Sequence, residues 1–193
     1  MLLGMNPGPW GMVQTGVPFG DPDMVREWIG IEAPVRKPGE EHPRRPVKGF
    51  TSHRREISGR RLWGWARERF GPARDFFTRF FVINYCPLCF LEESGRNRTP
   101  DRLPARERRA LFAACDLSLQ RMAAVLRPDC VIGLGRFPEH RAREALGDQR
   151  LRIGRAPHPS PANPRANRDW GAQMTETLQE MGIALPSGKA GQA

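Results

Sequence analysis

The chain has 193 residues, of which 39% are hydrophobic and 27% charged, a composition typical of one folded domain with a substantial core rather than of a disordered chain. Its formal net charge is +10 and its isoelectric point is about 10.8, which is typical of proteins that bind polyanions. No apolar run approaches the ~20 residues that cross a membrane and no secretory signal is recognisable, so we expect an intracellular protein without a membrane partner.

The first predicted element is a short strand over residues 1–5, which leads into the turn Gly4-Met5-Asn6-Pro7-Gly8-Pro9. Prolines fix φ and glycines permit close approach, so this turn holds the Asn6 amide in one conformation. A rigid polar turn just after a strand is where α/β sheets place their ligand sites. A plain strand-to-helix turn is the alternative for this stretch alone.

A helix over residues 22–29 is predicted next, because Asp21 suits the N-cap and Pro22 the first helical position. Residues 36–61 then carry nine Lys or Arg against three Glu, together with several prolines and glycines. This composition predicts a long basic loop that faces a polyanion. A general arginine bias that only solvates the surface is the alternative.

Strands and helices alternate over the rest of the chain. Ser58 is predicted to cap a helix that ends at Gly71. The remaining predicted strands cover residues 79–84, 129–133 and 151–156, and the remaining predicted helices cover residues 104–126, 138–146 and 169–181. The alternation predicts a three-layer α/β/α fold around a central, mostly parallel four-stranded sheet. We expect a single domain over residues 1–185 and a flexible tail over 186–193.

Three of the predicted strands hand over to a proline-rich polar turn. Asn6 lies in GMNPGP, Asn84 in NYCP and His158 in HPSPANP. Because the carboxyl ends of parallel strands share one edge of the sheet, we expect these three side chains to line one pocket.

The four cysteines carry a weaker signal. Cys86 and Cys89 form a C-x-x-C motif, which alone would suit zinc, an iron–sulfur cluster or a redox pair. Cys115 lies in a helical pattern and Cys130 in an apolar strand, and neither has a second C-x-x-C beside it. We therefore expect buried structural thiols, with no metal and no cofactor.

Several long segments, taken in order, resemble the single-strand-selective monofunctional uracil-DNA glycosylases of the uracil-DNA glycosylase superfamily. GMNPGPWGMVQTGVPFG resembles the first active-site motif of that family, and NYCPL resembles the turn that reads the base. GRNRTPDRLPAR resembles its DNA-contacting segment, and HPSPANPRAN its final catalytic and DNA-wedging loop. EHPRRPV, SGRRLWGW and GLGR also look familial, so the resemblance extends over nearly the whole chain.

The resemblance implies a DNA repair enzyme that flips uracil, and 5-modified uracils such as 5-hydroxymethyluracil, out of single- or double-stranded DNA and hydrolyses the base–sugar bond. It implies that His158 donates to uracil O2 and that Asn6 holds the attacking water, while Asn84 reads the base. It also implies three further roles around the base. The Met5 backbone borders the base, Gly8 leaves room at uracil C5, and Phe19 stacks on the base. Core packing is the alternative role for Phe19.

Two DNA-binding segments follow from the same resemblance. The first comprises Ser94, Gly95, Arg96, Asn97, Arg98, Arg102 and Arg106, and the second comprises Pro161, Ala162, Asn163 and Arg165. Relatives carry arginine where this chain has Ala162, so we expect a poorer fill of the gap that an extruded base leaves.

The motifs contain no obvious nucleophilic lysine, which predicts a monofunctional enzyme that leaves an abasic site without a strand break. We also expect the protein to be a monomer. Family members carry a helical segment and a full strand before the first motif, so we expect the first strand of this chain to be shortened. Two alternatives stay open. One is a glycosylase retuned to xanthine or hypoxanthine, and the other is a DNA-binding relative without turnover.

Overall fold

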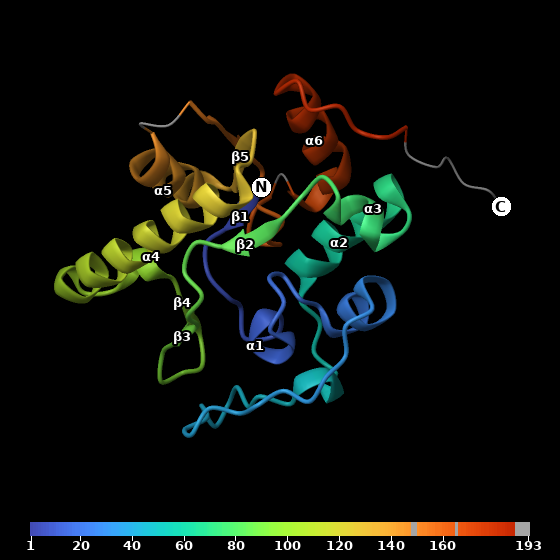
Figure 1. The fold of residues 1–193 in the computed structure, drawn as a ribbon. Helices are drawn as coiled ribbons and strands as arrows, with labels where there is room; N and C mark the ends of the chain where they lie inside the picture. Colours follow the sequence, from blue (N-terminus) through green and yellow to red (C-terminus); the bar gives the residue numbers. More distant parts are fainter. Residues whose placement is uncertain (148–149, 165, 188–193) are drawn as a thin grey trace.

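The computed structural model describes residues 1–147, 150–164 and 166–187. At its centre lies a four-stranded sheet in the order β2-β1-β5-β6, and all three pairings are parallel (Figure 1). The strands are β1 (Leu2–Gly4), β2 (Val82–Asn84), β5 (Cys130–Leu134) and β6 (Arg152–Ala156). The predicted parallel four-stranded sheet is therefore confirmed.

Helices cover both faces of this sheet. Leu2 and Ile132 point into a core of aromatic side chains under α2, α3 and α6, whereas Leu3 and Val131 point into a second core under α4 and α5. Figure 1 shows these two groups of helices on opposite sides of the strands. The helices are α2 (Ile57–Phe70), α3 (Ala73–Phe77), α4 (Ala105–Leu126), α5 (Arg136–Leu146) and α6 (Ala166–Glu180). The predicted three-layer α/β/α architecture is confirmed.

The start of α2 differs from the prediction. The helix begins at Ile57 with Glu56 as its N-cap residue, so the prediction that Ser58 caps it is wrong. The buried Asp21 carboxylate explains the earlier start, because it accepts the Glu56 backbone N–H at 3.1 Å. It also accepts the Met24 N–H at 3.4 Å, so one side chain ties together the starts of two helical segments.

A small second sheet lies between β2 and α4. Here β3 (Phe90–Leu91) and β4 (Asn97–Arg98) pair as an antiparallel hairpin. Gly95, in the turn between them, has a φ of 79°, a left-handed conformation that suits glycine. The 3₁₀ turn η3 (Pro100–Arg102) then leads into α4.

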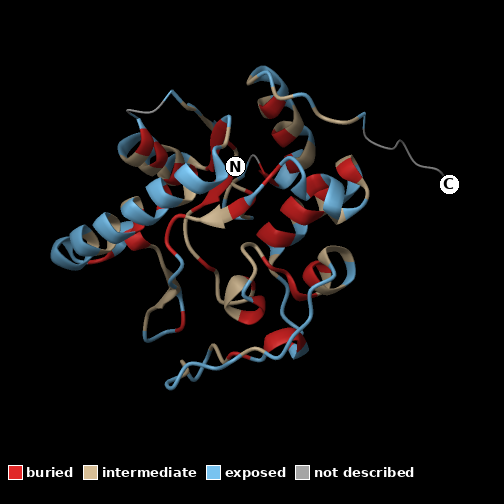
Figure 2. Cartoon of the chain, viewed as in Figure 1, coloured by how far each residue is buried: buried red, intermediate tan, exposed pale blue. Residues whose placement is uncertain are grey.

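The chain between β1 and α2 contains little regular structure. Its short elements are α1 (Met12–Thr15), the π-helical turn η1 (Met24–Ile29) and the 3₁₀ turn η2 (Gly49–Thr51). The predicted basic loop runs in extended and turn conformations up to the start of α2, and Figure 2 shows it as a largely exposed stretch. Near the other end of the chain, Asp169 interrupts α6 with non-helical dihedrals.

β1 is an inner strand, paired with β2 on one side and with β5 on the other, and the Met1 amino group donates to the Cys130 carbonyl at 2.8 Å. This pairing holds the turn that carries Asn6. Of the predicted tail, 188–193 lie outside the described residues. Within the described ranges, no helix has the length and apolar character needed to span a membrane.

Candidate active site

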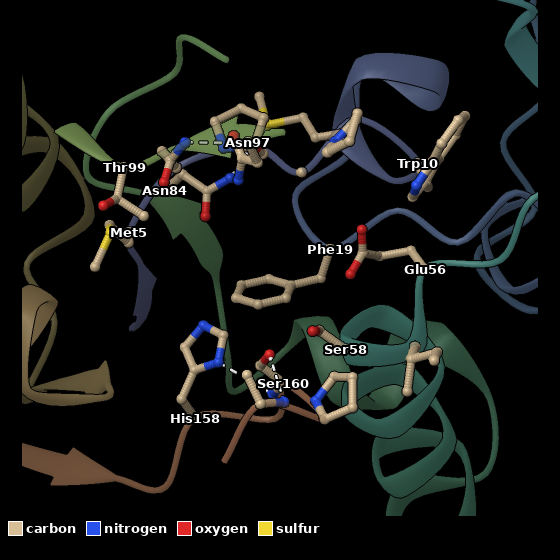
Figure 3. A pocket seen from close by; sticks show the side chains of 18 of the residues that line it. Met5, Trp10, Phe19, Glu56, Ser58, Asn84, Asn97, Thr99, His158 and Ser160 are labelled. Carbon is tan, nitrogen blue, oxygen red and sulfur yellow. Dashed lines mark hydrogen bonds between the residues drawn. The ribbon is translucent and has the colours of Figure 1, made fainter. Parts of the chain in front are cut away.

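The carboxyl ends of β1, β2 and β6 open into one pocket of about 620 Å³, a size typical of small-molecule sites (Figure 3). Asn6, Asn84 and His158 all line it, so the structure brings together the three polar turns as expected. The other predicted site residues along its wall are Met5, Gly8, Phe19, Asn97, Pro161, Ala162 and Asn163.

His158 is held as a neutral hydrogen-bond donor. Its Nδ1 accepts the Ser160 backbone N–H at 3.0 Å, which places the ring proton on Nε2. Burial lowers the pKa of the imidazole, so the ring is uncharged at neutral pH. The arrangement leaves Nε2–H as the donor that this ring can offer to a bound molecule.

The loop that carries His158 is anchored from two helices. Arg61 on α2 donates to the Pro159 carbonyl at 2.9 Å, and Trp170 on α6 donates its indole N–H to the Pro157 carbonyl at 2.8 Å. Asn163 closes the loop on itself by donating to the His158 carbonyl at 3.0 Å. The ring is therefore positioned in advance, which hydrogen-bond donors in active sites require.

Phe19 adopts a left-handed conformation, with φ at 54°, that costs free energy for a bulky residue. Its carbonyl accepts the Trp63 indole N–H at 3.0 Å and the Asp21 backbone N–H at 2.9 Å. Gly59 permits this contact, because a Cβ there would lie 1.9 Å from the Phe19 oxygen. The ring touches the aromatic core and also lines the pocket, with its centroid 6.4 Å from that of the His158 ring, so packing against the core leaves it accessible from the pocket.

Gly4, the last residue of β1, lets Asn84 and Phe19 approach each other. A Cβ at this position would lie 2.3 Å from Asn84 Oδ1 and 2.7 Å from Phe19 Cε2. Asn84 Nδ2 donates to the Met12 sulfur at 3.3 Å, which fixes the rotation of the amide. Neither Gly4 nor Met12 was predicted to belong to the site, since neither contact follows from strand spacing.

Asn6 is oriented by its own turn. Its Nδ2 donates to the Pro7 carbonyl at 3.2 Å, so the amide oxygen is the atom suited to accept a bond from water. An amide does not take up a proton near neutral pH. Asn6 can therefore position a water but cannot act as a general base.

Glu56 is a pocket residue that the sequence analysis missed. Its carboxyl is half-buried beside two glycines, because a Cβ at Gly8 would lie 2.8 Å from Oε2 and a Cβ at Gly11 would lie 2.8 Å from Cγ. Burial raises its pKa, hydrogen bonds from Ser58 partly offset this rise, and the charge of Asp21 adds to it. Figure 3 shows Glu56 on the opposite side of the Phe19 ring from Asn84. The only signal for Glu56 in the sequence is its place just before the predicted helix start at Ser58.

The first predicted DNA-binding segment is divided between the pocket and the surface. Asn97 lines the pocket, as does Thr99, which the sequence analysis did not assign. Arg96 makes two 3.0 Å bonds to Glu92, and Arg98 donates to the Arg102 carbonyl at 2.8 Å. The members of the segment that are exposed are Ser94, Arg96, Arg102 and Arg106, whereas Gly95 is buried in the hairpin turn.

The second predicted segment borders the pocket mouth. Pro161 and Ala162 are exposed there and Asn163 is half-buried. Arg165 lies outside the described residues. A side chain as short as that of Ala162 adds little surface at this rim.

The thiols do not form a reactive centre in the described part of the chain. Cys86, Cys115 and Cys130 are buried, Cys89 is half-buried, and all four are free. Burial raises the pKa of Cys89 to about 11 and that of Cys115 to about 12, which keeps both protonated. Among the described residues no cluster of His, Cys, Asp or Glu is arranged to hold a metal ion.

The site thus combines an aromatic face, an amide that both donates and accepts, and a neutral imidazole N–H. This set suits a planar heterocycle that carries carbonyl oxygens and a ring N–H. A family profile described as the uracil DNA glycosylase superfamily matches residues 1–182. The chain belongs to the uracil DNA glycosylase superfamily, in the group of the single-strand selective monofunctional uracil DNA glycosylases.

The relatives that place it in this group are mammalian. The single-strand selective monofunctional uracil DNA glycosylases of Bos taurus and Mus musculus are each 47% identical to it over 185 residues, or 95% of this chain. The match covers 68% of the bovine and 66% of the murine protein, so the chain spans about two thirds of their length. The crystal structure of wild-type Pedobacter heparinus SMUG2 superimposes with a TM-score of 0.68 at 20% identity, over 94% of this chain and 73% of that one, which shows a shared fold.

Proposed function

We propose that this chain is a monofunctional DNA glycosylase that hydrolyses the N-glycosidic bond of uracil in DNA and leaves an abasic site. Membership of the uracil DNA glycosylase superfamily supports this activity. We further propose that the chain acts inside the cell as a monomer, on single- and double-stranded DNA, and that it also accepts uracils substituted at C5.

The observation that carries the proposal is the neutral His158 facing the same pocket as Asn84 and Phe19. When the base leaves as an anion, negative charge develops on uracil O2, and the fixed His158 Nε2–H is suited to stabilise it. A neutral donor also avoids a buried cation whose proton would be lost to the departing base.

The other residues divide the remaining work. The Asn84 amide can accept from uracil N3–H and donate to O4, a pattern that cytosine reverses. Phe19 would stack under the extruded base, a contact worth about 1 to 3 kcal/mol. Asn6 would hold the attacking water without removing its proton, so the developing sugar cation must draw part of its stabilisation from the DNA phosphates.

The wall beside Gly8 supports the acceptance of C5 substituents. If Asn84 pairs with N3 and O4 and His158 with O2, the C5 edge turns away from both residues and toward Gly8 and Glu56. Gly8 adds no side chain to this wall, and the Glu56 carboxyl lies against it, with Oε2 2.8 Å from where a Cβ on Gly8 would be. The Glu56 carboxyl, whose pKa is raised by burial, can donate to or accept from a polar substituent such as a hydroxymethyl group.

The decisive experiment is a cleavage assay on labelled oligonucleotides, with alkali added afterwards to reveal abasic sites. Single and double strands would carry uracil, 5-hydroxymethyluracil, xanthine or hypoxanthine. We expect release of uracil and 5-hydroxymethyluracil, with strand breaks only after alkali. Release mainly of xanthine or hypoxanthine would move the substrate assignment to deaminated purines, and binding without release of any base would overturn the proposal.

A further inference from the structure

Two arginines of the basic loop converge on an aromatic ring at the edge of the pocket. The Arg45 guanidinium lies 4.8 Å from the centroid of the Trp10 ring, and that of Arg54 lies 5.3 Å from it. Trp10 itself lines the pocket that receives the base. Stacking on an aromatic ring orients a guanidinium plane and leaves its N–H edges available to a ligand.

The loop that supplies these arginines is attached to the active-site turn by Gln14, which is completely buried. Its Nε2 donates to the Pro9 carbonyl at 2.8 Å and to the Pro46 carbonyl at 3.2 Å, and its Oε1 accepts the Lys48 N–H at 2.8 Å. Val47, between these contacts, donates its N–H to Glu41 at 2.6 Å. The basic loop is therefore a built part of the site rather than a loose solvated arm.

The same loop packs against the hairpin turn of β3 and β4. His42 Nε2 lies 3.0 Å from the Glu92 carbonyl oxygen, and Arg44 donates to the Ser94 carbonyl at 3.5 Å. A Cβ on Gly95 would lie 3.2 Å from Arg44 Cβ and 3.4 Å from Arg45 Cζ. The two arginines that lie against Trp10, the β3–β4 hairpin and the pocket mouth thus form one continuous surface.

Three arginines of this surface carry positive charge without carboxylate partners among the described residues. In the part of the chain that the structure describes, the ion pairs include neither Arg44 nor Arg45 nor Arg54. Arg45 Nε is moreover a buried donor with no hydrogen-bond partner among the described residues. Crowded like charges and an unsatisfied donor both cost free energy in the free protein, and a bound anion relieves both.

We propose that Trp10, Arg45 and Arg54 form a phosphate clamp that grips the backbone of the DNA strand beside the extruded nucleotide. The inference rests on the proposed function, which supplies the DNA strand. It assigns the phosphate contact to named residues of the basic loop that was predicted to face a polyanion, and these residues lie outside the two predicted DNA-binding segments. Guanidinium forks match phosphate oxygens in geometry, and contacts to the backbone are independent of base sequence. The alternative is that the two stacked arginines only stabilise the loop.

The test measures binding rather than excision, so it remains informative if the enzyme prefers another base. Arg45→Gln/Arg54→Gln would be compared with the wild type for binding to a fluorescent single-stranded oligonucleotide carrying a tetrahydrofuran abasic analogue, over a series of NaCl concentrations. We expect binding weaker by about tenfold or more. We also expect the slope of log affinity against log salt to become shallower by roughly 0.7 per lost phosphate contact.

The matched control is Arg121→Gln/Arg150→Gln, which removes the same charge from exposed positions on α4 and just before β6 and should leave the slope near that of the wild type. Arg45→Lys/Arg54→Lys keeps the charge and should retain the slope while losing affinity, because lysine lacks the fork. An unchanged slope in the glutamine variant, or an equal change in the control, would overturn the clamp. Thermal unfolding shows whether each variant is folded. If the glutamine variant is unfolded, the lysine variant tests the clamp instead, and wild-type affinity in the lysine variant would overturn it.

Discussion

The pocket and the basic surface beside it are built on opposite principles. In the pocket, His158 and Asn6 are uncharged, and each is fixed by a backbone contact, His158 by the Ser160 N–H and Asn6 by the Pro7 carbonyl. Along the neighbouring loop, the working groups are exposed or half-buried cations that rest on Trp10. The pocket is suited to discriminate between bases, and the loop is suited to hold any strand.

The difference teaches that recognition and grip are separable in this molecule. Interactions in a desolvated pocket are screened little by salt, whereas phosphate contacts weaken steeply as salt rises. Variants of the pocket should therefore alter turnover and base choice at any ionic strength. Variants of the loop should alter affinity in a salt-dependent way and leave base choice unchanged.

The largest expected effect comes from His158→Ala. Removal of a positioned donor to developing negative charge typically lowers kcat by about 10²- to 10³-fold. Single-turnover release of uracil measures this loss, with His140→Ala, an exposed histidine on α5, as the control. If His158→Ala weakened only substrate affinity and left kcat unchanged, the assigned role would be contradicted. The pocket would then contribute to binding, as the loop does.

Gly4→Ala should disturb the pocket from beneath. The added methyl would overlap Asn84 Oδ1 and the Phe19 ring, and forced overpacking of this kind costs about 1 to 3 kcal/mol in the free energy of unfolding. The midpoint temperature of thermal unfolding and the rate of uracil release should both fall. Gly64→Ala on α2, where a Cβ meets nothing within 4 Å, is the matched control and should be neutral or stabilising. Equal behaviour of the two variants would mean that Gly4 is not needed for close packing.

Glu56→Leu should change base choice more than overall rate. Loss of one hydrogen bond to a C5 hydroxymethyl group corresponds to about 0.5 to 1.5 kcal/mol, which is roughly a twofold to thirteenfold fall in the kcat/KM ratio of 5-hydroxymethyluracil to uracil. Glu56→Gln keeps a donor and an acceptor and should retain the ratio. Glu68→Leu, on the exposed side of α2, controls for the apolar substitution. An unchanged ratio in Glu56→Leu would restrict Glu56 to a role at the helix start.

The smallest expected effect is in the pH profile. Burial lowers the pKa of His158 below its ordinary value of 6.5, so the folded protein binds this proton more weakly than the unfolded chain. The resulting stability is fully present above pH 6.5 and is lost as pH falls through the folded pKa. The His158 ring also stays neutral in the folded protein down to about pH 6.5. Single-turnover rates should therefore stay level to that pH and decline only in more acid solution. A decline that begins above pH 6.5 would show a histidine with a raised pKa.

Much of the fold was predictable because strands and helices leave local signals. The alternation of apolar runs with amphipathic stretches predicted the layers, and α2 ends at Gly71 as expected. The start of α2 was mispredicted at Ser58, because the Asp21 carboxylate that fixes Glu56 lies 35 residues away in the chain. Arg96 was predicted to contact DNA, but its guanidinium donates two hydrogen bonds to Glu92 within the protein.

The sequence by itself determined that three rigid polar turns follow parallel strands, and parallel geometry alone then places Asn6, Asn84 and His158 at one edge. Only the tertiary structure decided what surrounds them. Glu56 enters the pocket and Trp10 meets its two arginines because loops far apart in the chain cross at the carboxyl edge of the sheet. Periodicity and spacing report on neighbours along a strand or helix, whereas such crossings depend on packing between segments that share no local pattern.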